Sequence, residues 1–506
     1  MAARRARRRE RTRAEGIAQL PWRRLENPYA PVEILGEDQI EAIHLASMRV
    51  LEETGMEVLG DAALDAYAAG GADVDRANRR VRLDRDLIAE TVAKAPAEFT
   101  LHARNPERSV VIGGRHMGFC NATTPPFCTD LDGGRRMGNA EDFKTLVKLL
   151  QVLNVVHFFY GYPVEPQDMP PETRHLDCYF LLATLSDKCW RAYSQDRRQA
   201  LDAIEMTRIA RGVSSHTMAA EPALFLNVNT NSPLRLDGPQ SDGLIEFARM
   251  GQPVTLTAFT MAGAMAPATV AGALVLQNAE VLSGIALAQM VNPGTPAIYG
   301  AFTSNVHMRS GSLALGTPEF TQASLASGQL ARRYRLPLRL CNANSSPTVD
   351  AQAAYESGMS LWGAVMGHGN IVSHGVGWLE SGLSFSYEKA MIDAEMLQMM
   401  ARVLTPPVVD ADTLAVDAIA EVGPGGHFFG AAHTLERFQT AFYEPLLSDW
   451  RPFDTWTEDG AKTATQRANA LWKKLLNEYE EPPMDPAVRE ELVAYVRRRK
   501  DEIAKG

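Results

Sequence analysis

The chain has 506 residues, of which 45% are hydrophobic and 22% charged, the composition of a globular protein with a substantial core. Its formal net charge of −10 offers no basic field to attract phosphates, so we expect no nucleic acid partner. The five cysteines are odd in number and form no CxxC pair, which argues against a structural zinc site and favours a reducing compartment, the cytoplasm.

The N-terminal part of the chain divides into two segments. The first thirteen residues hold seven arginines, and no apolar stretch follows them that would make a signal peptide. We therefore expect residues 1–25 to be a disordered, Arg-rich tail. Residues 26–110 show helical periodicity at 38–54, 61–69 and 84–94, which predicts an N-terminal helical cap.

Residues 111–405 alternate short β-rich runs with helices of ten to twenty residues, the pattern typical of parallel βαβ units. The predicted strand positions are 117–122 together with 127–131, 155–162, 189–194, 223–229, 253–260, 296–302, 337–342 and 370–375. Helices are expected at 139–153, 173–186, 197–211, 241–249, 269–290, 318–334, 350–366 and 387–403. Eight alternations in one series predict an α/β fold, a closed (β/α)8 TIM barrel. No GxGxxG follows a strand and no GxxxxGK[ST] occurs, so open-sheet phosphate-binding folds are disfavoured.

The predicted helix at 269–290 is apolar on nearly every side. Glu280 is the only formally charged side chain between Arg249 and Arg309. Polar residues nevertheless interrupt the helix too often for a bilayer span, so we expect no membrane partner. A helix buried on two faces is the better interpretation. Burial of its outer face would require a second subunit or an added domain, which predicts a homo-oligomer.

The C-terminal part, residues 406–506, begins with an irregular segment that contains Pro406, Pro407 and the glycine-rich stretch 423–426. Two closing helices are expected at 463–479 and 485–503. We expect these helices to wrap the barrel or a neighbouring subunit.

In barrels of this kind the chemistry lies at the carboxyl ends of the strands. The residues predicted there are rich in amides and aromatic rings and poor in carboxylates, which disfavours the paired-acid chemistry of glycosidases. No HxH or HExxH motif is present, so no metal site is expected. Aromatic faces suit a quaternary ammonium, which has no N–H to donate. The predicted substrate-binding residues are Tyr160, Asn227, Asn229, Tyr299, Asn342, Trp378, Glu380, Phe385 and Tyr387, although a single aromatic residue is more often core packing.

His374 lies at the end of the eighth predicted strand and is the candidate catalytic residue. A glycine follows it in the sequence SHGVGWLESG, which would let a ligand approach the backbone. A lone histidine is usually structural, but this position favours ligand contact or proton handling. Cys341 is a weak candidate nucleophile, because nothing near it in sequence resembles an activating base.

Over residues 25–480 the chain resembles the trimethylamine methyltransferase family. The matching blocks are FCNATTPPFCTDLDGGRRMGNAEDF at 119–143, APATVAGALVLQNAEVLSGIALAQMVNPGTPAIYG at 266–300, DAQAAYESGMSLW at 350–362 and GWLESGLSFSYEKAMIDAEMLQMM at 377–400. The resemblance implies a barrel fold and methyl transfer from a methylated amine to the cobalt of a corrinoid (cobalamin), normally carried by a separate corrinoid protein.

The chain departs from the family's founding archaeal members, which carry pyrrolysine in the region equivalent to residues 342–347. Here that region reads CNANSSPTVD from Cys341, with standard residues throughout. Relatives without pyrrolysine include methyltransferases that act on glycine betaine and others that act on carnitine-like or proline-derived betaines. The resemblance therefore implies a small quaternary amine as substrate, most simply glycine betaine giving dimethylglycine, with no pyrrolysine needed. His374, Asn342 and Arg309 are candidates to anchor a substrate carboxylate.

Two other functions remain open from the sequence. A barrel lyase acting on an amine would need a base at a strand end, and His374 and Glu380 are the residues that qualify. A non-catalytic protein that binds quaternary amines would need the same aromatic residues and no chemistry.

Overall fold

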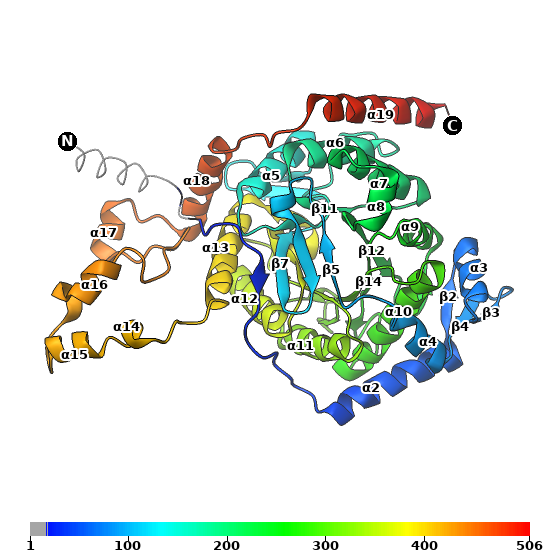
Figure 1. The fold of residues 1–506 in the computed structure, drawn as a ribbon, viewed down its shortest axis with the longest axis horizontal. Helices are drawn as coiled ribbons and strands as arrows, with labels where there is room; N and C mark the ends of the chain where they lie inside the picture. Colours follow the sequence, from blue (N-terminus) through cyan, green and yellow to red (C-terminus); the bar gives the residue numbers. More distant parts are fainter. Residues whose placement is uncertain (1–16, 18, 506) are drawn as a thin grey trace.

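The computed structural model describes residue 17 and residues 19–505, and at its centre eight parallel strands close into a barrel (Figure 1). The strands are β7 (His116–Asn121), β10 (Phe158–Phe159), β11 (Cys189–Ala192), β12 (Leu224–Thr230), β14 (Val254–Ala258), β16 (Ala297–Ala301), β19 (Leu338–Cys341) and β20 (Ile371–Val376). They are neighbours in chain order, and β20 pairs with β7 to close the ring. The predicted (β/α)8 barrel is confirmed.

A helix follows each barrel strand and packs on the outside. The eight helices are α5 (Ala140–Val152), α6 (Arg174–Leu185), α7 (Arg197–Arg211), α9 (Gly238–Arg249), α10 (Val270–Val291), α11 (Pro318–Arg333), α12 (Ala351–Met366) and α13 (Tyr387–Val403), with a short α8 (Ser215–Ala220) after α7. All but α6 begin at an Asn, Asp, Ser or Thr whose side chain accepts a hydrogen bond from a first-turn amide. Such N-caps explain why the helices begin where they do.

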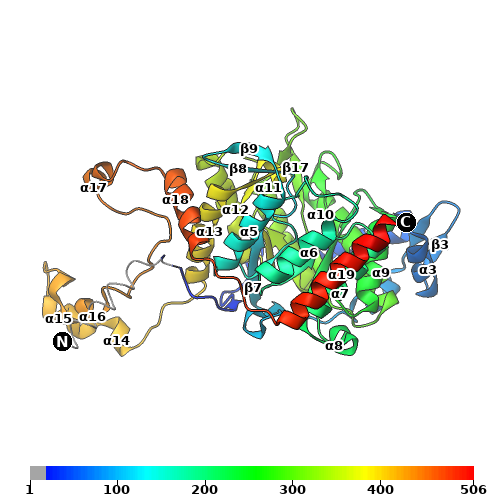
Figure 2. The same ribbon diagram turned by 90° about the horizontal axis from the view of Figure 1, so that it is seen from above.

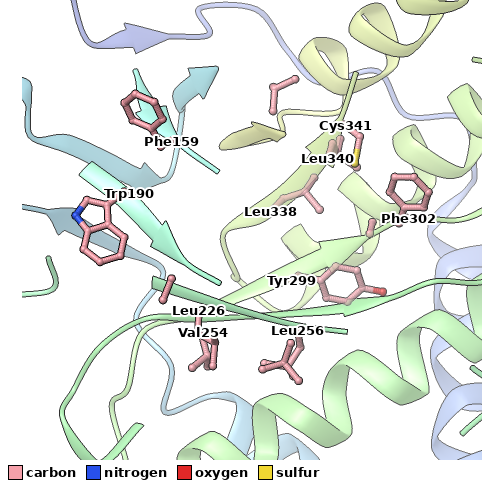
Figure 3. Close-up of a cluster of buried hydrophobic side chains, with 14 of the residues drawn as sticks. Phe159, Trp190, Leu226, Val254, Leu256, Tyr299, Phe302, Leu338, Leu340 and Cys341 are labelled. Atoms are coloured by element: carbon pink, nitrogen blue, oxygen red, sulfur yellow. The ribbon is translucent and has the colours of Figure 1, made fainter. Parts of the chain in front are cut away.

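Alternate residues of the strands face opposite sides of the barrel wall. Inward-facing side chains at the amino ends form an apolar cluster that includes Cys120, Phe158, Phe225 and Ile298. The hairpin of β5 (Glu98–Leu101) and β6 (Val110–Gly113) adds Leu101 and other apolar residues to this cluster. The amino end of the barrel is thus packed core. Outward-facing residues meet the helices, as Figure 3 shows for Phe159, Trp190, Leu226, Leu256 and Tyr299.

The N-terminal segment contains the three predicted helices, α2 (Glu37–Arg49, continued by a π turn, Val50–Thr54), α3 (Asp61–Ala69) and α4 (Arg85–Val92). It also contains strands that the helical periodicity did not predict: β1 (Leu25–Glu26), β2 (Met56–Val58), β3 (Asp73–Asp75) and β4 (Arg80–Arg82). The last three form a sheet with β13 (Arg235–Leu236).

The N-terminal helices α2, α3 and α4 pack against α10. Helix α10 is long and apolar enough to cross a membrane, but 78% of its most apolar window is buried inside the molecule. The prediction of two buried faces is therefore correct. Of the two covers expected for the outer face, a second subunit or an added domain, the structure shows the second, because this chain's own N-terminal helices lie on it. The homo-oligomer stays a prediction.

Short strands after the barrel strands build a rim at the carboxyl end. These are β8 (Phe127–Asp130), β9 (Gly134–Met137), β15 (Met261–Ala262), β17 (Ser304–Val306), β18 (Leu313–Ala314), β21 (Trp378–Leu379) and β22 (Ser384–Ser386). The sequence analysis counted 127–131 as part of the first barrel strand. In the structure β8 instead pairs with β9 and β22 outside the barrel.

Beyond Val403 the chain forms a projecting segment with four short helices, α14 (Ala411–Leu414), α15 (Val416–Val422), α16 (Ala432–Arg437) and α17 (Phe453–Glu458) (Figure 2). It then returns as α18 (Ala464–Asn477), which packs on α13 and α5, and α19 (Pro486–Ala504), which packs on α6 and α7. The two closing helices thus wrap the chain's own barrel. Most of the predicted Arg-rich tail lies outside the described residues.

His157 connects the barrel wall to the N-terminal segment in its neutral form. Its Nδ1 accepts a hydrogen bond from the amide of Phe119 at 3.1 Å, so Nε2 carries the proton and donates to the carbonyl of Arg23 at 3.1 Å. Burial, with a smaller contribution from the nearby Lys188, lowers the pKa of His157 to about 4. A second proton would have to break the bond from Phe119.

We predict that His157 makes the fold sensitive to acid. Its pKa in the unfolded chain is near 6.5, so the unfolded state takes up a proton below that pH while the folded state does not. Stability is therefore constant above pH 6.5 and falls as the pH drops toward 4, by about 2 kcal/mol at pH 5. Urea unfolding at pH 7 and pH 5 should show that His157→Gln removes about this much of the pH dependence. If wild type and His157→Gln lost the same stability between pH 7 and pH 5, His157 would not be the source of the acid sensitivity.

Candidate functional site

Two arginines project into the carboxyl half of the barrel, Arg191 from β11 and Arg339 from β19, and both are buried. Arg191 donates to the hydroxyl of Thr123 at 3.0 Å, and Arg339 donates to the carbonyl of Ala301 at 3.3 Å. Within the described part of the chain neither guanidinium has a carboxylate partner, and the Nε of each has no hydrogen-bond partner. A buried charge without a counter-ion is costly. The pair therefore has the character of an anion site.

Tyr160 lies between the two arginines. Its ring centroid is 4.7 Å from the guanidinium carbon of Arg191 and 5.2 Å from that of Arg339. The electron-rich ring face stabilises both cations without neutralising either. Its hydroxyl donates to Asn227 at 2.8 Å, and Asn227 in turn donates to Asn229 at 2.8 Å. Asn227 is half-buried and Asn229 is exposed, so this chain of hydrogen bonds runs from the arginines to solvent at the barrel mouth.

Gly161 makes room for Arg191. Its φ of +90° is a conformation that other residues rarely adopt, and a Cβ placed there would lie 2.7 Å from a terminal nitrogen of Arg191. Any side chain at this position would displace the guanidinium. The backbone after β10 is thus shaped around the cation.

His374 contacts Arg339 directly. A terminal N–H of Arg339 donates to His374 Nε2 at 3.0 Å, so the proton of the neutral ring is on Nδ1, which has no partner of its own. Burial first, then the charges of Arg339 and Arg191, hold the pKa of His374 well below its usual value. His374 also adopts a φ of +58°, where the register of β20 against β7 is irregular. A neutral ring with a free buried N–H, held in a strained conformation, is typical of a ligand contact.

Aromatic rings form a wall beside Arg339 and His374. The Trp378 ring centroid is 4.1 Å from that of His374 and 6.4 Å from that of Phe302. Phe302 stacks on Phe259 at 5.0 Å, and Phe259 is partly exposed at the mouth. The site therefore combines a cationic floor with an aromatic wall.

A buried ion pair behind the barrel fixes the turn that carries Trp378. Asp393 of α13 accepts a hydrogen bond from the amide of Gly377 at 2.9 Å and is paired with Lys389, and both side chains are fully buried. The indole N–H of Trp378 donates to the carbonyl of Asn344 at 3.0 Å, and the Asn344 amide donates back to the carbonyl of Trp378 at 2.8 Å. Trp378 is thus held on two sides.

The structure brings together four of the predicted residues around the arginines: Tyr160, Asn227, His374 and Trp378, with Asn229 above them. Tyr299 lies elsewhere, because it faces the helices and bonds to Gln277 and Asn278 of α10 (Figure 3). The prediction that Tyr299 binds the substrate is therefore corrected.

The other predicted residues also lie outside the barrel interior. Asn342 donates to the carbonyl of Gly375 and to Asp393, and Phe385 packs against Gly377. The hydroxyl of Tyr387 donates to Asp142 at 3.2 Å, and Glu380 is paired with Arg135 at 3.0 Å. Asn342 and Phe385 support the turn, whereas Tyr387 and Glu380 belong to the structure around the rim.

The surroundings of Arg309 and Cys341 argue against a role in the site for either residue. Arg309 is exposed in the turn between β17 and β18, so it is not placed to anchor a buried group. Burial raises the pKa of the Cys341 thiol, which disfavours the nucleophilic thiolate. Among residues 17 and 19–505 no group of three or more His, Cys, Asp or Glu side chains is arranged to hold a metal ion.

Sequence reasoning missed Arg191 and Arg339. The signal was present, because each is an arginine inside a short apolar strand, in CWRA and LRLC. Strands of a parallel barrel are buried on both faces, so a charge in the middle of one marks the interior. Both arginines precede the last residue of their strand, whereas the predicted site residues lie at the strand ends and in the loops after them.

Comparison of the whole chain with known proteins identifies its relatives. A model of the family described as "Trimethylamine methyltransferase (MTTB)" matches residues 1–504. A glycine betaine methyltransferase from Desulfitobacterium hafniense (strain Y51) is 40% identical over 471 residues, which cover 93% of this chain and 98% of that protein. A trimethylamine methyltransferase MttB from Desulfitobacterium hafniense (strain DSM 10664 / DCB-2) is 28% identical over 92% of this chain and 94% of its own length.

Among solved structures, the monomethylamine methyltransferase MtmB of Methanosarcina barkeri is similar at a TM-score of 0.48 and 12% identity, covering 88% of this chain and 95% of its own. The family match spans nearly the whole chain, barrel and C-terminal helices included. The chain therefore belongs to the trimethylamine methyltransferase (MTTB) family and is a methyltransferase.

Proposed function

We propose that this methyltransferase demethylates a quaternary amine that also carries a carboxylate, with glycine betaine as the substrate and dimethylglycine as the product. The methyl acceptor is the Co(I) centre of a corrinoid, most simply on a separate corrinoid protein. The observation that carries the proposal is the pair of buried arginines without a carboxylate partner. Identity to a glycine betaine methyltransferase supports the choice of substrate.

The substrate carboxylate would bind at the arginines. A carboxylate accepts charge-assisted hydrogen bonds from guanidinium groups, and it would supply the negative charge that Arg191 and Arg339 lack. The free Nδ1–H of His374 offers one further donor. Asn342 is engaged by the carbonyl of Gly375 and Arg309 is exposed, so neither residue is placed for this role.

The quaternary nitrogen would lie toward the mouth, against Phe259, Phe302 and Trp378. Aromatic faces attract a cation that has no N–H to donate. Because the carboxylate is held below, one N-methyl group would point out of the barrel. Fixing the reacting carbon in this orientation is the main contribution of the chain's own residues to the rate.

Methyl transfer from a quaternary nitrogen requires no proton transfer to or from the protein. The C–N bond breaks with its electron pair left on nitrogen, so the leaving group is a neutral tertiary amine. The Co(I) corrinoid supplies the electron pair for the new bond to the methyl carbon. Arg191, Arg339 and His374 hold the substrate throughout, and the aromatic wall excludes water from the methyl group.

The barrel mouth suits an acceptor that arrives from outside. Its rim exposes apolar side chains from loops that follow four different strands, among them Met137, Met265, Met308 and Leu383. An exposed apolar rim is typical of a protein docking surface. These residues fit a corrinoid protein that presents its cofactor to the mouth.

The lyase alternative loses support from the contacts of its two candidate bases. The lone pair of His374 Nε2 is occupied by Arg339, and Glu380 is paired with Arg135. Neither group is free to take a proton from a substrate.

We predict that the enzyme selects substrates by their carboxylate. With reduced cobalamin as acceptor, glycine betaine should be turned over with a kcat/KM at least about 100-fold above that of choline, because choline leaves both guanidiniums unpaired. Trimethylamine should be inactive. The cobalt spectrum follows methyl transfer in each assay. Equal turnover of choline and glycine betaine would contradict the carboxylate site.

Removal of either arginine should abolish this selectivity. Arg339→Gln and Arg191→Gln should each raise the KM for glycine betaine by about 30-fold or more, as expected when one partner of a buried charge pair is lost. The small turnover of choline should change little. Arg197→Gln, at an exposed arginine paired with Glu246, is the matched control and should behave as wild type.

Replacement of a buried arginine by an apolar residue should not make the ligand-free protein less stable than wild type. Because each arginine is a buried charge without a counter-ion, Arg339→Met should leave the Tm of the ligand-free protein unchanged or raise it. Thermal unfolding with and without glycine betaine measures this, and only wild type should be stabilised by the ligand. A large fall in Tm for the ligand-free variant would show that Arg339 is structural.

A further inference from the structure

A long segment after α13 leaves the body of the molecule, and we call residues 406–460 the arm. Between Thr405 and Leu446 the only buried residue is Ala431. The arm is nevertheless anchored at two places: Arg23 donates to Thr405, just before it, at 2.8 Å, and within it the amide of Leu447 and the hydroxyl of Ser448 donate to Glu395 of α13 at 2.7 Å and 3.2 Å. The projection in Figures 1 and 2 therefore starts from fixed attachment points.

The arm exposes more apolar surface than an isolated chain normally does. Five aromatic residues on it are 68–90% exposed: Phe429, Phe438, Phe442, Trp450 and Phe453. At roughly 150–250 Å² per aromatic side chain, these five alone expose on the order of 700 Å². In total, this area approaches the ~800 Å² that each partner buries in a standard stable interface.

We propose that the arm is an exchange arm that packs on the outer face of α12 in a second copy of this chain. Tyr355, Met359 and Trp362 form an exposed stripe along α12, at spacings of four and three residues, and they are 43–61% exposed. The one charged residue between Ala351 and Met366, Glu356, is buried. A surface helix with an uncharged outer face is typical of a contact surface.

Geometry favours a reciprocal pair of copies. The arm continues directly from α13, and α13 packs beside α12, so the root of each arm lies next to the stripe that receives the partner's arm. A two-fold axis would then form both arm-on-stripe contacts at once. Arm-on-arm pairing is disfavoured by charge, because the arm carries ten acidic and two basic residues.

The position of the arm disfavours a corrinoid protein as its occupant. A partner that receives the methyl group has to reach the barrel mouth, which is marked by β8, β9 and β17. Figure 2 shows α14, α15 and α16 displaced toward the opposite end of the barrel axis, whereas α17 lies level with the mouth but to the side of the barrel, beyond α18. The larger part of the arm and the mouth thus serve different contacts, and this inference does not depend on the proposed substrate.

Sedimentation velocity on the full chain tests the proposal. Wild type should be a dimer, and two double variants should dissociate with the dimer Kd raised about 30-fold or more: Phe438→Asp with Phe442→Asp on the arm, and Met359→Asp with Trp362→Asp on the stripe. Leu201→Asp with Val493→Asp, at exposed apolar residues of α7 and α19, is the matched control and should remain dimeric. Circular dichroism should show unchanged helix content in every variant.

Mixing the two dissociated variants makes the test specific. A mixed dimer retains one intact contact, between the wild-type arm of one chain and the wild-type stripe of the other, so dimers should reappear on mixing. A monomeric wild type, a dimeric arm variant, a dimeric stripe variant or a mixture that stays monomeric would each overturn the proposal. An arm variant that is still dimeric but no longer transfers methyl groups to a corrinoid protein would assign the arm to that partner instead.

Discussion

The structure depends most on two positive charges buried without a counter-ion. Arg191 and Arg339 lie in a closed barrel, within reach of one tyrosine ring and a few neutral acceptors. Several neighbouring features follow from them. Gly161 leaves space for one guanidinium and His374 presents a lone pair to the other. Burial first, and then both arginine charges, lower the pKa of that histidine and keep it neutral. A barrel that needed only stability would not retain such an arrangement, because apolar residues of similar volume would be as stable or more so.

The barrel separates stability from function along its axis. Its amino end is filled by apolar side chains and closed by the β5–β6 hairpin, as expected for a packed core. This half can sustain unfavourable features in the other half, such as the left-handed backbone at His374. The buried Lys389–Asp393 pair holds the next turn through Gly377, so the strained residue is braced from behind the wall.

Periodicity predicted the barrel well, because alternating strands and capped helices are local features of the sequence. The side of the barrel wall that each side chain faces was harder to predict. Tyr160 and Tyr299 each lie near the carboxyl end of a strand, yet Tyr160 faces inward and Tyr299 faces the helices. A shift of one residue in the strand reverses every side chain, and the sequence does not fix that register. The packing of the N-terminal helices on α10 was not predicted, because these contacts join residues far apart in the sequence.

The proposed reaction gives the arginines a role beyond gripping the substrate. Methyl transfer converts a zwitterion into a carboxylate with a neutral amine, so the positive charge on nitrogen disappears along the reaction path. Two unit charges about 7 Å apart repel by about 2 kcal/mol at an effective dielectric constant near 20. Repulsion between the guanidiniums and the quaternary nitrogen is therefore relieved in the transition state, while attraction for the carboxylate is kept. Interactions that improve only as the reaction proceeds raise kcat, so the same two residues would both select the substrate and promote its demethylation.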